Sequence, residues 1–319
     1  MNILYLVVQQ TMFFSIPLLI VALGGVFTER GGVTNIALDG MMIMGAFTGI
    51  FFINQMEGQM SGQLLLLLAI LISVLTGIVF SLFHAYASVN MKSDQIISGT
   101  ALNMFAPAFA IFTARMIQPN GVQQIQFENT FRIHSVPVLG DIPIIGGMFF
   151  QNAYITTYIG FIILIISIIV LYKTRFGLRL RACGEHPHAA DSVGINVYKM
   201  RYAGVIISGA LAGLGGLVFV IPTSTNFNET VSGYGFLALA VMIFGQWKPL
   251  RVLFAAFFFG LMKTIAAAYS VIPLLATAPI PSDVYKMVPF IATLIVLAFS
   301  SKSSQAPRAV AVPYDKGSR

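Results

Sequence analysis

Long apolar runs alternate with short polar intervals along most of the chain. A helix needs about 20 apolar residues to cross a lipid bilayer, and nine runs reach or approach that length. They are residues 3–27, 38–54, 62–88, 95–115, 152–172, 202–222, 233–246, 251–272 and 284–301. The first run is interrupted by two glutamines, and 38–54 and 233–246 are short. The pattern predicts an all-α fold, a polytopic membrane bundle of about 8–10 transmembrane helices.

Composition supports a membrane protein with one domain. Hydrophobic residues make up 57% of the chain and charged residues 9%, whereas soluble domains are about one quarter charged. We expect residues 1–301 to form a transmembrane domain and 302–319 to be a disordered polar tail. The first apolar run lacks a basic segment before it and leads into further runs, so we interpret it as a retained span.

The distribution of basic residues predicts the orientation. If the polar interval 173–201 is cytoplasmic and the runs alternate, 14 of the 18 Lys and Arg residues fall on the cytoplasmic side, and so does the C-terminus. The net charge of +7 therefore reflects membrane topology, and no nucleic-acid partner is expected. The interval 116–151 is then exterior. Its two Pro-rich stretches suit a lid that folds over the membrane face or a docking surface for a receptor.

Residues 24–40 contain two glycine pairs, a charged pair, Asn35 and Asp39 between two closely spaced apolar runs. Irregular backbone at membrane depth persists only where protein or water satisfies its polar groups, and transporters use such broken helices to build substrate sites. The alternative is an ordinary cytoplasmic turn with Glu29 and Arg30 at its tip. Spacing leaves both interpretations open.

Two further polar residues lie inside apolar runs. Asn103 is either a helix-packing hydrogen bonder or a contact to transported solute. Lys263 follows Arg251 by twelve residues, which is about 18 Å along a helix, so it either faces a wet cavity or extends to the outer surface. We hypothesise a translocation pathway lined or supported by Asn35, Asp39, Asn103 and Lys263. The small residues of Gly209–Gly216 are expected to mediate helix contact.

The interval from Lys173 to Arg201 carries six of the 18 basic residues. Within it, Glu185–Val193 is predicted to form a short helix, because Pro187 is tolerated in a first turn and Gly194 can terminate a helix in a left-handed conformation. A short polar helix between two membrane spans suits contact with a soluble partner.

Several chemistries are not indicated by the sequence. The chain has one cysteine, Cys183, and so cannot form an internal disulfide. His186 and His188 point to different faces of a helix and have no companion ligands, so no metal site is expected. A Gly-Lys dipeptide is missing, which excludes a Walker-type phosphate loop, and no catalytic constellation or cofactor site stands out.

Four stretches resemble one transporter family. LGGVFTERGGVTNIALDGMM at 23–42 is similar to the N-terminal signature of bacterial ABC-importer permeases of the branched-chain amino acid and simple-sugar family, in its nucleoside-uptake subgroup. RFGLRLRACGEHPHAADSVGI at 175–195 resembles that family's cytoplasmic coupling segment. SGALAGLGG at 208–216 and GYGFLALAV at 233–241 follow in the expected order. Asp39 departs from the pattern, since the subgroup more often has Glu.

The resemblance implies a permease subunit that forms half of a translocation pathway in the bacterial cell membrane. Its partners would be a second permease subunit, a separate ABC ATPase and an extracellular substrate-binding protein or lipoprotein, with a nucleoside as the small-molecule substrate. The chain itself would not be an enzyme. The segment 184–194 would be the coupling helix, in which the resemblance implicates Gly184, Glu185, His186, Pro187, Ala189, Ala190, Asp191 and Gly194.

Other functions fit parts of the sequence. A permease for simple sugars or other small solutes would share most of these motifs. An ion-coupled secondary transporter could use Asp39 and Lys263 for coupling, but it would have no use for the long interval 173–201. A membrane enzyme or scaffold is disfavoured because catalytic groups are not clustered.

Overall fold

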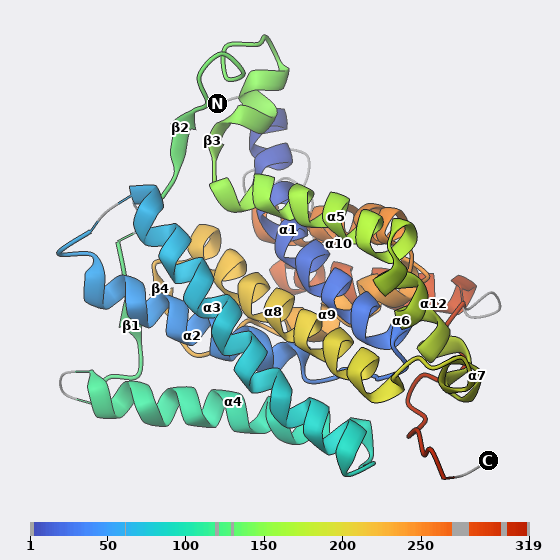
Figure 1. The fold of residues 1–319 in the computed structure, drawn as a ribbon. Coiled ribbons are helices and arrows are strands. Elements are labelled where there is room, and N and C mark those ends of the chain that lie inside the picture. The colour runs from blue at the N-terminus through green and yellow to red at the C-terminus, as the bar shows by residue number, and fades with distance from the viewer. Residues whose placement is uncertain are drawn as a thin grey trace.

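Helices make up most of the structure, a computed structural model that describes residues 3–60, 62–118, 121–128, 131–269, 281–300 and 305–317. The predicted all-α polytopic bundle is confirmed (Figure 1). Its α-helices are α1 (Ile3–Arg30), α2 (Leu38–Met56), α3 (Gly62–Ala85), α4 (Gln95–Ile117), α5 (Ile155–Lys173), α6 (Arg175–Glu185), α7 (Pro187–Ser192), α8 (Val197–Thr223), α9 (Tyr234–Phe244), α10 (Pro249–Ala268) and α12 (Ser282–Ser300).

Six helices in the described part of the chain are long and apolar enough to cross a membrane. They are α1, α3 with the π-helical turn that extends it to Asn90, α4, α5, α8 and α10. The expected short runs correspond to α2, which carries polar residues at both ends, and to α9, which has only 11 residues. Part of the run 251–272 lies outside the described residues.

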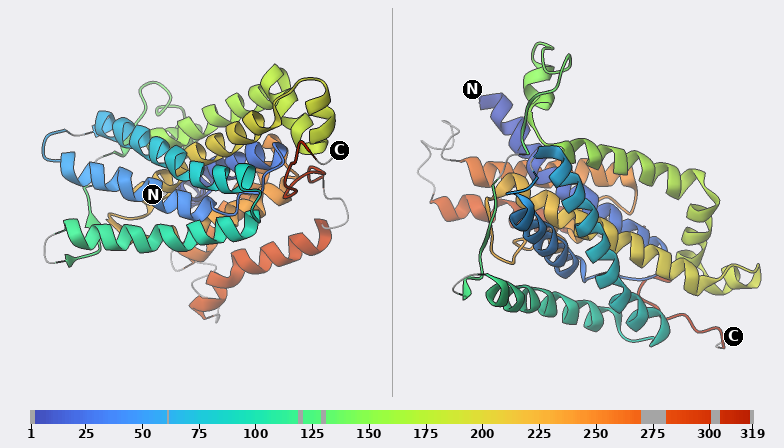
Figure 2. Two further views of the ribbon diagram at one scale, coloured as in Figure 1. Left: turned by 60° about the horizontal axis from the view of Figure 1, so that its bottom comes forward. Right: turned by 60° about the vertical axis from the view of Figure 1, so that its left-hand side comes forward.

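The buried centre of the bundle is formed by α1 and α8, with α2 and α3 packed around them (Figures 1 and 2). Small residues allow the close approach that the sequence predicted for Gly209–Gly216. A Cβ atom placed on Gly213 would lie 2.3 Å from the carbonyl oxygen of Ser73 and 3.0 Å from the Cα of Gly77, both on α3. Helix backbones can approach this closely only where the side chain is missing.

Helix α4 lies at the edge of the bundle (Figure 2), and only 17% of its most apolar 18-residue stretch is buried. Many of its apolar side chains are exposed, among them Met104 and Phe112. In a membrane protein such a surface is suited to lipid or to another membrane subunit.

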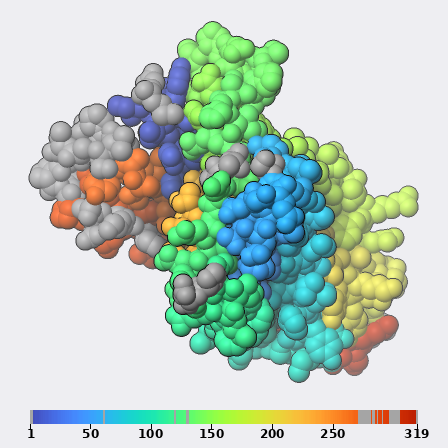
Figure 3. All heavy atoms as spheres, turned by 90° about the vertical axis from the view of Figure 1, so that its left-hand side faces the viewer, coloured from blue at the N-terminus to red at the C-terminus, as the bar shows by residue number. Residues whose placement is uncertain are grey.

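The residues expected to form an exterior lid build a small lobe beside the N-terminal part of α1 (Figure 3). Strand β2 (Ile133–Ser135) pairs antiparallel with β3 (Gln151–Ala153), and β1 (Ile125–Gln126) pairs with β4 (Asn226–Phe227). Gln9 on α1 donates from Nε2 to the carbonyl oxygen of Gly147 at 2.8 Å. The apolar tip of the lobe is exposed, since Val138 is 79% accessible.

The C-terminal residues differ from the expected disordered tail. Residues 305–317 run beside α7 in an extended path (Figure 1). Tyr314 is only 4% exposed and packs with Cys183, Ala190 and Val197. One aromatic side chain that fits an apolar recess orders a segment whose composition alone indicates disorder.

Candidate functional site

The chain breaks between α1 and α2. Helix α1 ends at Arg30 and α2 begins at Leu38, so the break predicted over residues 24–40 is confined to 31–37. Gly32 adopts a left-handed conformation with φ of 88°, which glycine accepts without strain. The first glycine pair lies inside α1 and serves packing, because a Cβ on Gly24 would lie 3.0 Å from the carbonyl oxygen of Ser208.

Side chains from α3 and α4 satisfy the backbone of the break. The amide of Thr34 donates to Oε1 of Gln95 at 2.7 Å, and the carbonyl oxygen of Thr34 lies 2.9 Å from Nε2 of His84. With Nε2 donating, Nδ1 of His84 accepts from the hydroxyl of Ser98 at 3.1 Å. Sequence reasoning missed His84 and Gln95. Their signal was a polar residue at the end of an apolar run, opposite an irregular segment.

Asn103 lies at the break and supports the start of α2. Its Oδ1 accepts from the amide of Gly40 at 2.7 Å, and its Nδ2 donates to the carbonyl oxygen of Ile36 at 2.8 Å. The first amides of a helix have no partner within the helix, so a side chain from α4 takes that role here. Asn35 is fully buried, donates to the hydroxyl of Ser208 at 3.0 Å and accepts from the amide of Ala37.

Asp39 links the start of α2 to the start of α9. Its Oδ1 accepts from the amide of Gly235 at 2.9 Å, so a carboxylate meets the positive end of a second short helix. The 11 residues of α9 span roughly 16 Å at the helical rise. Just beyond its far end, Trp247 Nε1 donates to Oε2 of Glu29 at 2.6 Å, near the end of α1. Asp39 therefore lies inside the bundle, about the length of α9 from the end of α1.

Lys263 on α10 also reaches the start of α9. Its Nζ lies 5.5 Å from the ring centroid of Tyr234, a cation–π geometry. It lines a largely apolar cavity of about 520 Å³ between α9, α10 and α12, together with Phe236 and Pro289. Lys263 therefore lies beside a largely apolar cavity, and the two interpretations of its role stay predictions. The four candidate pathway residues are thus grouped around the break and the first turn of α9.

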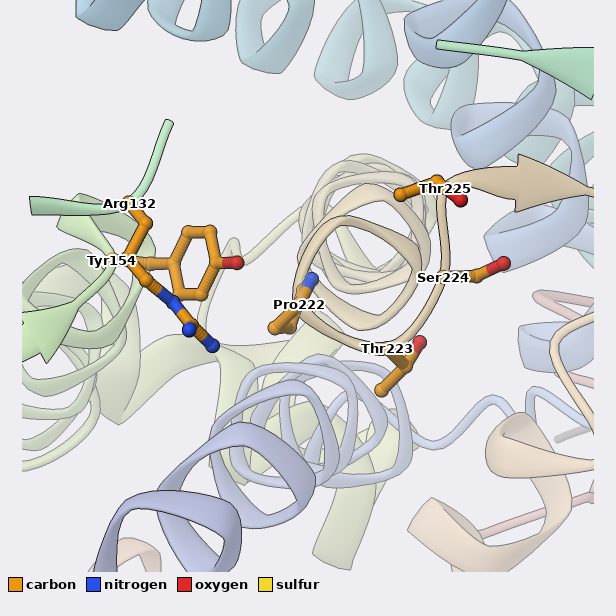
Figure 4. A pocket seen from close by; sticks show the side chains of 6 residues that line it. All are labelled: Arg132, Tyr154, Pro222, Thr223, Ser224 and Thr225. Carbon is orange, nitrogen blue, oxygen red and sulfur yellow. The ribbon is translucent and has the colours of Figure 1, made fainter. Parts of the chain in front are cut away.

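A more polar cavity of about 560 Å³ lies at the opposite end of the bundle from α7 (Figure 4). Arg132, Tyr154 and the last turn of α8 with the residues that follow it, Pro222 to Thr225, line it. The guanidinium carbon of Arg132 lies 5.6 Å from the ring centroid of Tyr154. Sequence reasoning did not identify this cavity, because its residues come from segments far apart in the chain.

The helix predicted over Glu185–Val193 is shorter than expected, and a second helix precedes it. Glu185 is the last residue of α6, and α7 comprises Pro187–Ser192. His186 separates them and caps α7, since its Nδ1 accepts from the amide of Ala189 at 3.3 Å. Helix α6 was missed because its Arg-rich sequence reads as a loop, although Thr174 caps it through a bond to the amide of Gly177.

The residues implicated in coupling range from exposed to buried. Exposed are Glu185, His186, Ala189 and Gly194; half-buried are Pro187 and Asp191; buried are Gly184 and Ala190. Gly194 has φ of 82°, the predicted left-handed conformation after α7. Gly184 packs on the end of α1, where its Cβ would lie 2.2 Å from the carbonyl oxygen of Arg30. Arg30 also forms a 3.6 Å ion pair with Glu185.

The described residues contain no group of three or more His, Cys, Asp or Glu side chains that could hold a metal ion. The thiol of Cys183 is buried, and burial raises its pKa to about 11, although the charge of Arg201 opposes the shift. Cys183 is therefore protonated at neutral pH and unreactive.

Comparison with known proteins gives full-length matches. The chain is 43% identical to the guanosine ABC transporter permease protein NupQ of Bacillus subtilis, with 100% of this chain and 99% of the relative covered. It is 41% identical to the nucleoside ABC transporter permease protein NupC of Lactococcus lactis, covering 99% and 98%. A putative glucose ABC transporter permease protein, TsgC13 of Haloferax volcanii, is 28% identical over 93% and 91%. No solved structure matches.

Residues 7–297 match the family described as branched-chain amino acid transport system, permease component. That match covers the six candidate membrane spans except the first four residues of α1, and it includes the break and the α6–α7 segment. The identities to two curated permeases extend over essentially the whole chain. The chain therefore belongs to the branched-chain amino acid transport system permease family, as a multi-pass membrane subunit.

Proposed function

We propose that this protein is the permease subunit of an ATP-driven importer of nucleosides in the bacterial cell membrane. The observation that carries the proposal is the full-length identity to two permeases named for nucleosides. A guanosine permease and a nucleoside permease are 43% and 41% identical to the chain over essentially its whole length.

The proposed subunit works with partners. A second permease would complete the pathway, an extracellular binding protein or lipoprotein would deliver the nucleoside, and a separate ABC ATPase would hydrolyse ATP. We place the α7 end and the C-terminus in the cytoplasm, because the exposed basic residues Lys173, Arg175 and Arg179 gather there. Segment 184–194 would then contact the ATPase through its exposed residues.

The proposed pathway passes the break. Asn35, Asp39 and Asn103 hold the starts of α2 and α9 in place, and Lys263 lines the cavity beside α9. Short helices that begin inside the bundle leave backbone dipoles and polar side chains where a solute could pass, as in other transporters with discontinuous helices.

The direct test is transport by the assembled complex. The chain would be expressed with the permease, ATPase and binding-protein genes that neighbour its own, and uptake of labelled guanosine, uridine and glucose measured in energised vesicles. We expect ATP-dependent accumulation of nucleosides and no accumulation of glucose. Glucose uptake in place of nucleoside uptake would overturn the substrate assignment. Concentrative uptake by this chain alone, driven by an ion gradient in liposomes, would overturn the importer assignment.

A further inference from the structure

Residues 305–317, here called the C-terminal strap, lie across the α7 end of the molecule (Figures 1 and 2). Hydrogen bonds through its backbone hold the strap, including one from the amide of Gln305 to Oε1 of Gln246 at 2.8 Å. The amide of Ala309 donates to the carbonyl oxygen of Gly184 at 2.9 Å, and Nη1 of Arg201 donates to the carbonyl oxygen of Val312 at 3.0 Å. Arg201 is only 1% exposed, so the strap covers a buried guanidinium at the start of α8.

Tyr314 is the side chain that joins the strap to α7. Its ring centroid lies 5.1 Å from that of His188 on α7 and 5.4 Å from that of Tyr198 on α8. The guanidinium carbon of Arg201 lies 5.9 Å from the same ring. Beneath the ring, Cys183 and Ala190 are buried. Tyr314 therefore covers the inner face of α7 and ties it to α8.

Charged contacts extend the strap on both sides. Asp315 pairs with Lys92, in the turn between α3 and α4, at 2.9 Å, and this hydrogen bond lowers the pKa of Asp315. Lys316 lies 3.8 Å from Asp191 on α7. Exposed ion pairs contribute little stability, so they set the direction of the strap more than its affinity.

The strap completes a polar recess beside α7. A cavity of about 360 Å³ is lined by the end of α7, the turn into α8 and Lys316 of the strap. Its other lining residues include Asp191, Asn196 and Tyr198. Three separate segments thus form one concave surface at the end of the molecule where basic residues gather.

The strap also touches the break between α1 and α2. A Cβ on Gly32 would lie 3.1 Å from Nη2 of Arg201, 3.4 Å from the carbonyl oxygen of Ala309 and 3.4 Å from that of Cys183. The strap, α6 and α8 therefore meet the first residues of the break at one point. The strap therefore connects the end of α6 and the start of α8 to the break.

We propose that the C-terminal strap is a positioning element for the ATPase contact: it holds α7 in the orientation that the ATPase binds, and Lys316 completes the recess that receives a polar side chain of that subunit. This inference rests on the proposed function. Helix α7 has six residues and cannot maintain itself in water, so its orientation depends on the surfaces that cover it. Tyr314 supplies an aromatic contact to that helix.

The test compares Tyr314→Ala with two matched variants in the assembled complex. Tyr314→Phe keeps the ring contacts, and Val312→Ala changes an exposed side chain of the same strap. Tyr314→Ala loses the ring contacts to both His188 and Tyr198, and we expect the equilibrium constant for the docked position of α7 to fall about tenfold. We expect nucleoside uptake and nucleoside-stimulated ATP hydrolysis to fall about tenfold in Tyr314→Ala and to stay near wild type in the other two.

The readouts separate this inference from the proposed function. If the wild-type complex shows no nucleoside-stimulated ATP hydrolysis, the proposed function fails. If the wild type is stimulated and well-folded Tyr314→Ala behaves identically, the strap proposal fails. A further variant carries Lys92→Cys and Asp315→Cys in a Cys183→Ala background, joined by a flexible thiol cross-linker. The proposal requires that the strap stays docked during transport, so the cross-linked variant should retain uptake. Loss of uptake on cross-linking this double-cysteine variant would contradict the proposal.

Discussion

The break between α1 and α2 and the α6–α7 segment use polar residues in opposite ways. At the break, Asn35, Asn103 and His84 are directed inward, and each bonds to backbone or to a side chain of another element. In α6–α7, the polar residues Glu185 and His186 face outward, and the described contacts that hold the segment involve mainly its buried side. Both regions interrupt apolar sequence, but the polar side chains are buried or half-buried and bonded in one and exposed in the other.

This difference predicts two kinds of mutational effect. Changes at the break should lower stability and assembly, because an unpaired buried polar group costs about 1–3 kcal/mol. Changes on the exposed side of α7 should leave the folded protein intact and alter its response to the ATPase. Variants that violate this division would show which region has been interpreted wrongly.

The largest effect is expected for Asn103→Leu. The substitution leaves the amide of Gly40 and the carbonyl oxygen of Ile36 without their partner, at a cost of about 2–6 kcal/mol in total. We expect lower yield, lower thermal stability in detergent and loss of uptake. Thr100→Leu is the control, since Thr100 is exposed on the same helix and bonds only within it. Equal stability of the two variants would refute the role given to Asn103.

Asp39→Asn should separate charge from shape. The amide oxygen of Asn can still accept a hydrogen bond from the amide of Gly235. The free energy of unfolding should therefore change by no more than about 1 kcal/mol, and the complex should still assemble. The negative charge at the start of α9 is lost, and we expect uptake to decrease although the complex still forms. The measurement is uptake normalised to the amount of assembled complex. Wild-type uptake would limit Asp39 to a packing role.

Lys263→Met tests the cavity beside α9. Met is similar in length and apolar, so it should fill the space with little effect on expression. Because Lys263 lines the cavity and contacts Tyr234, we expect altered uptake, seen as a change in the apparent affinity for nucleoside. Unchanged uptake with slightly higher stability would instead indicate that the ammonium group extends to the membrane surface.

The smallest effect is expected for Glu229, which lies between β4 and α9. Unlike the polar side chains at the break, it is buried without hydrogen bonds among the described residues. Its side chain is 1% exposed, and neither carboxylate oxygen has a hydrogen-bond partner among the residues that the structure describes. Burial raises the pKa of Glu229 from 4.5 to about 7, partly opposed by the charge of Arg115. The folded state therefore binds more protons than the unfolded state between about pH 4.5 and 7, so this group's contribution to stability is lost as the pH rises through that window.

Glu229→Gln should remove this dependence. Gln cannot ionise, so the variant should melt a few degrees higher than wild type above pH 7, and the difference should disappear below about pH 4.5. Thermal unfolding in detergent at several pH values measures it. A constant difference across the pH range would mean that folding does not change the pKa of Glu229.

The sequence predicted the membrane bundle, the break and the short helix after Pro187, because each leaves a local pattern: apolar runs, clustered glycines, and Pro with a following Gly. It did not predict the partners of the break. His84 and Gln95 acquire their roles only when α3 and α4 are placed beside residues 31–37. The ordered strap was also missed, because the burial of Tyr314 depends on a recess built from α6, α7 and α8.

The central claim, that the α6–α7 segment couples this permease to an ATPase, is tested most directly with Ala190→Pro. Proline removes the bond from the amide of Ala190 to the carbonyl oxygen of His186 and clashes with the preceding turn, at a cost of about 3 kcal/mol or more. Ala190→Ser keeps the amide and serves as the control. ATPase co-purification and nucleoside-stimulated ATP hydrolysis would be measured for both variants. The account predicts that Ala190→Pro reaches the membrane but loses ATPase association or its stimulation, whereas wild-type levels of both would contradict it.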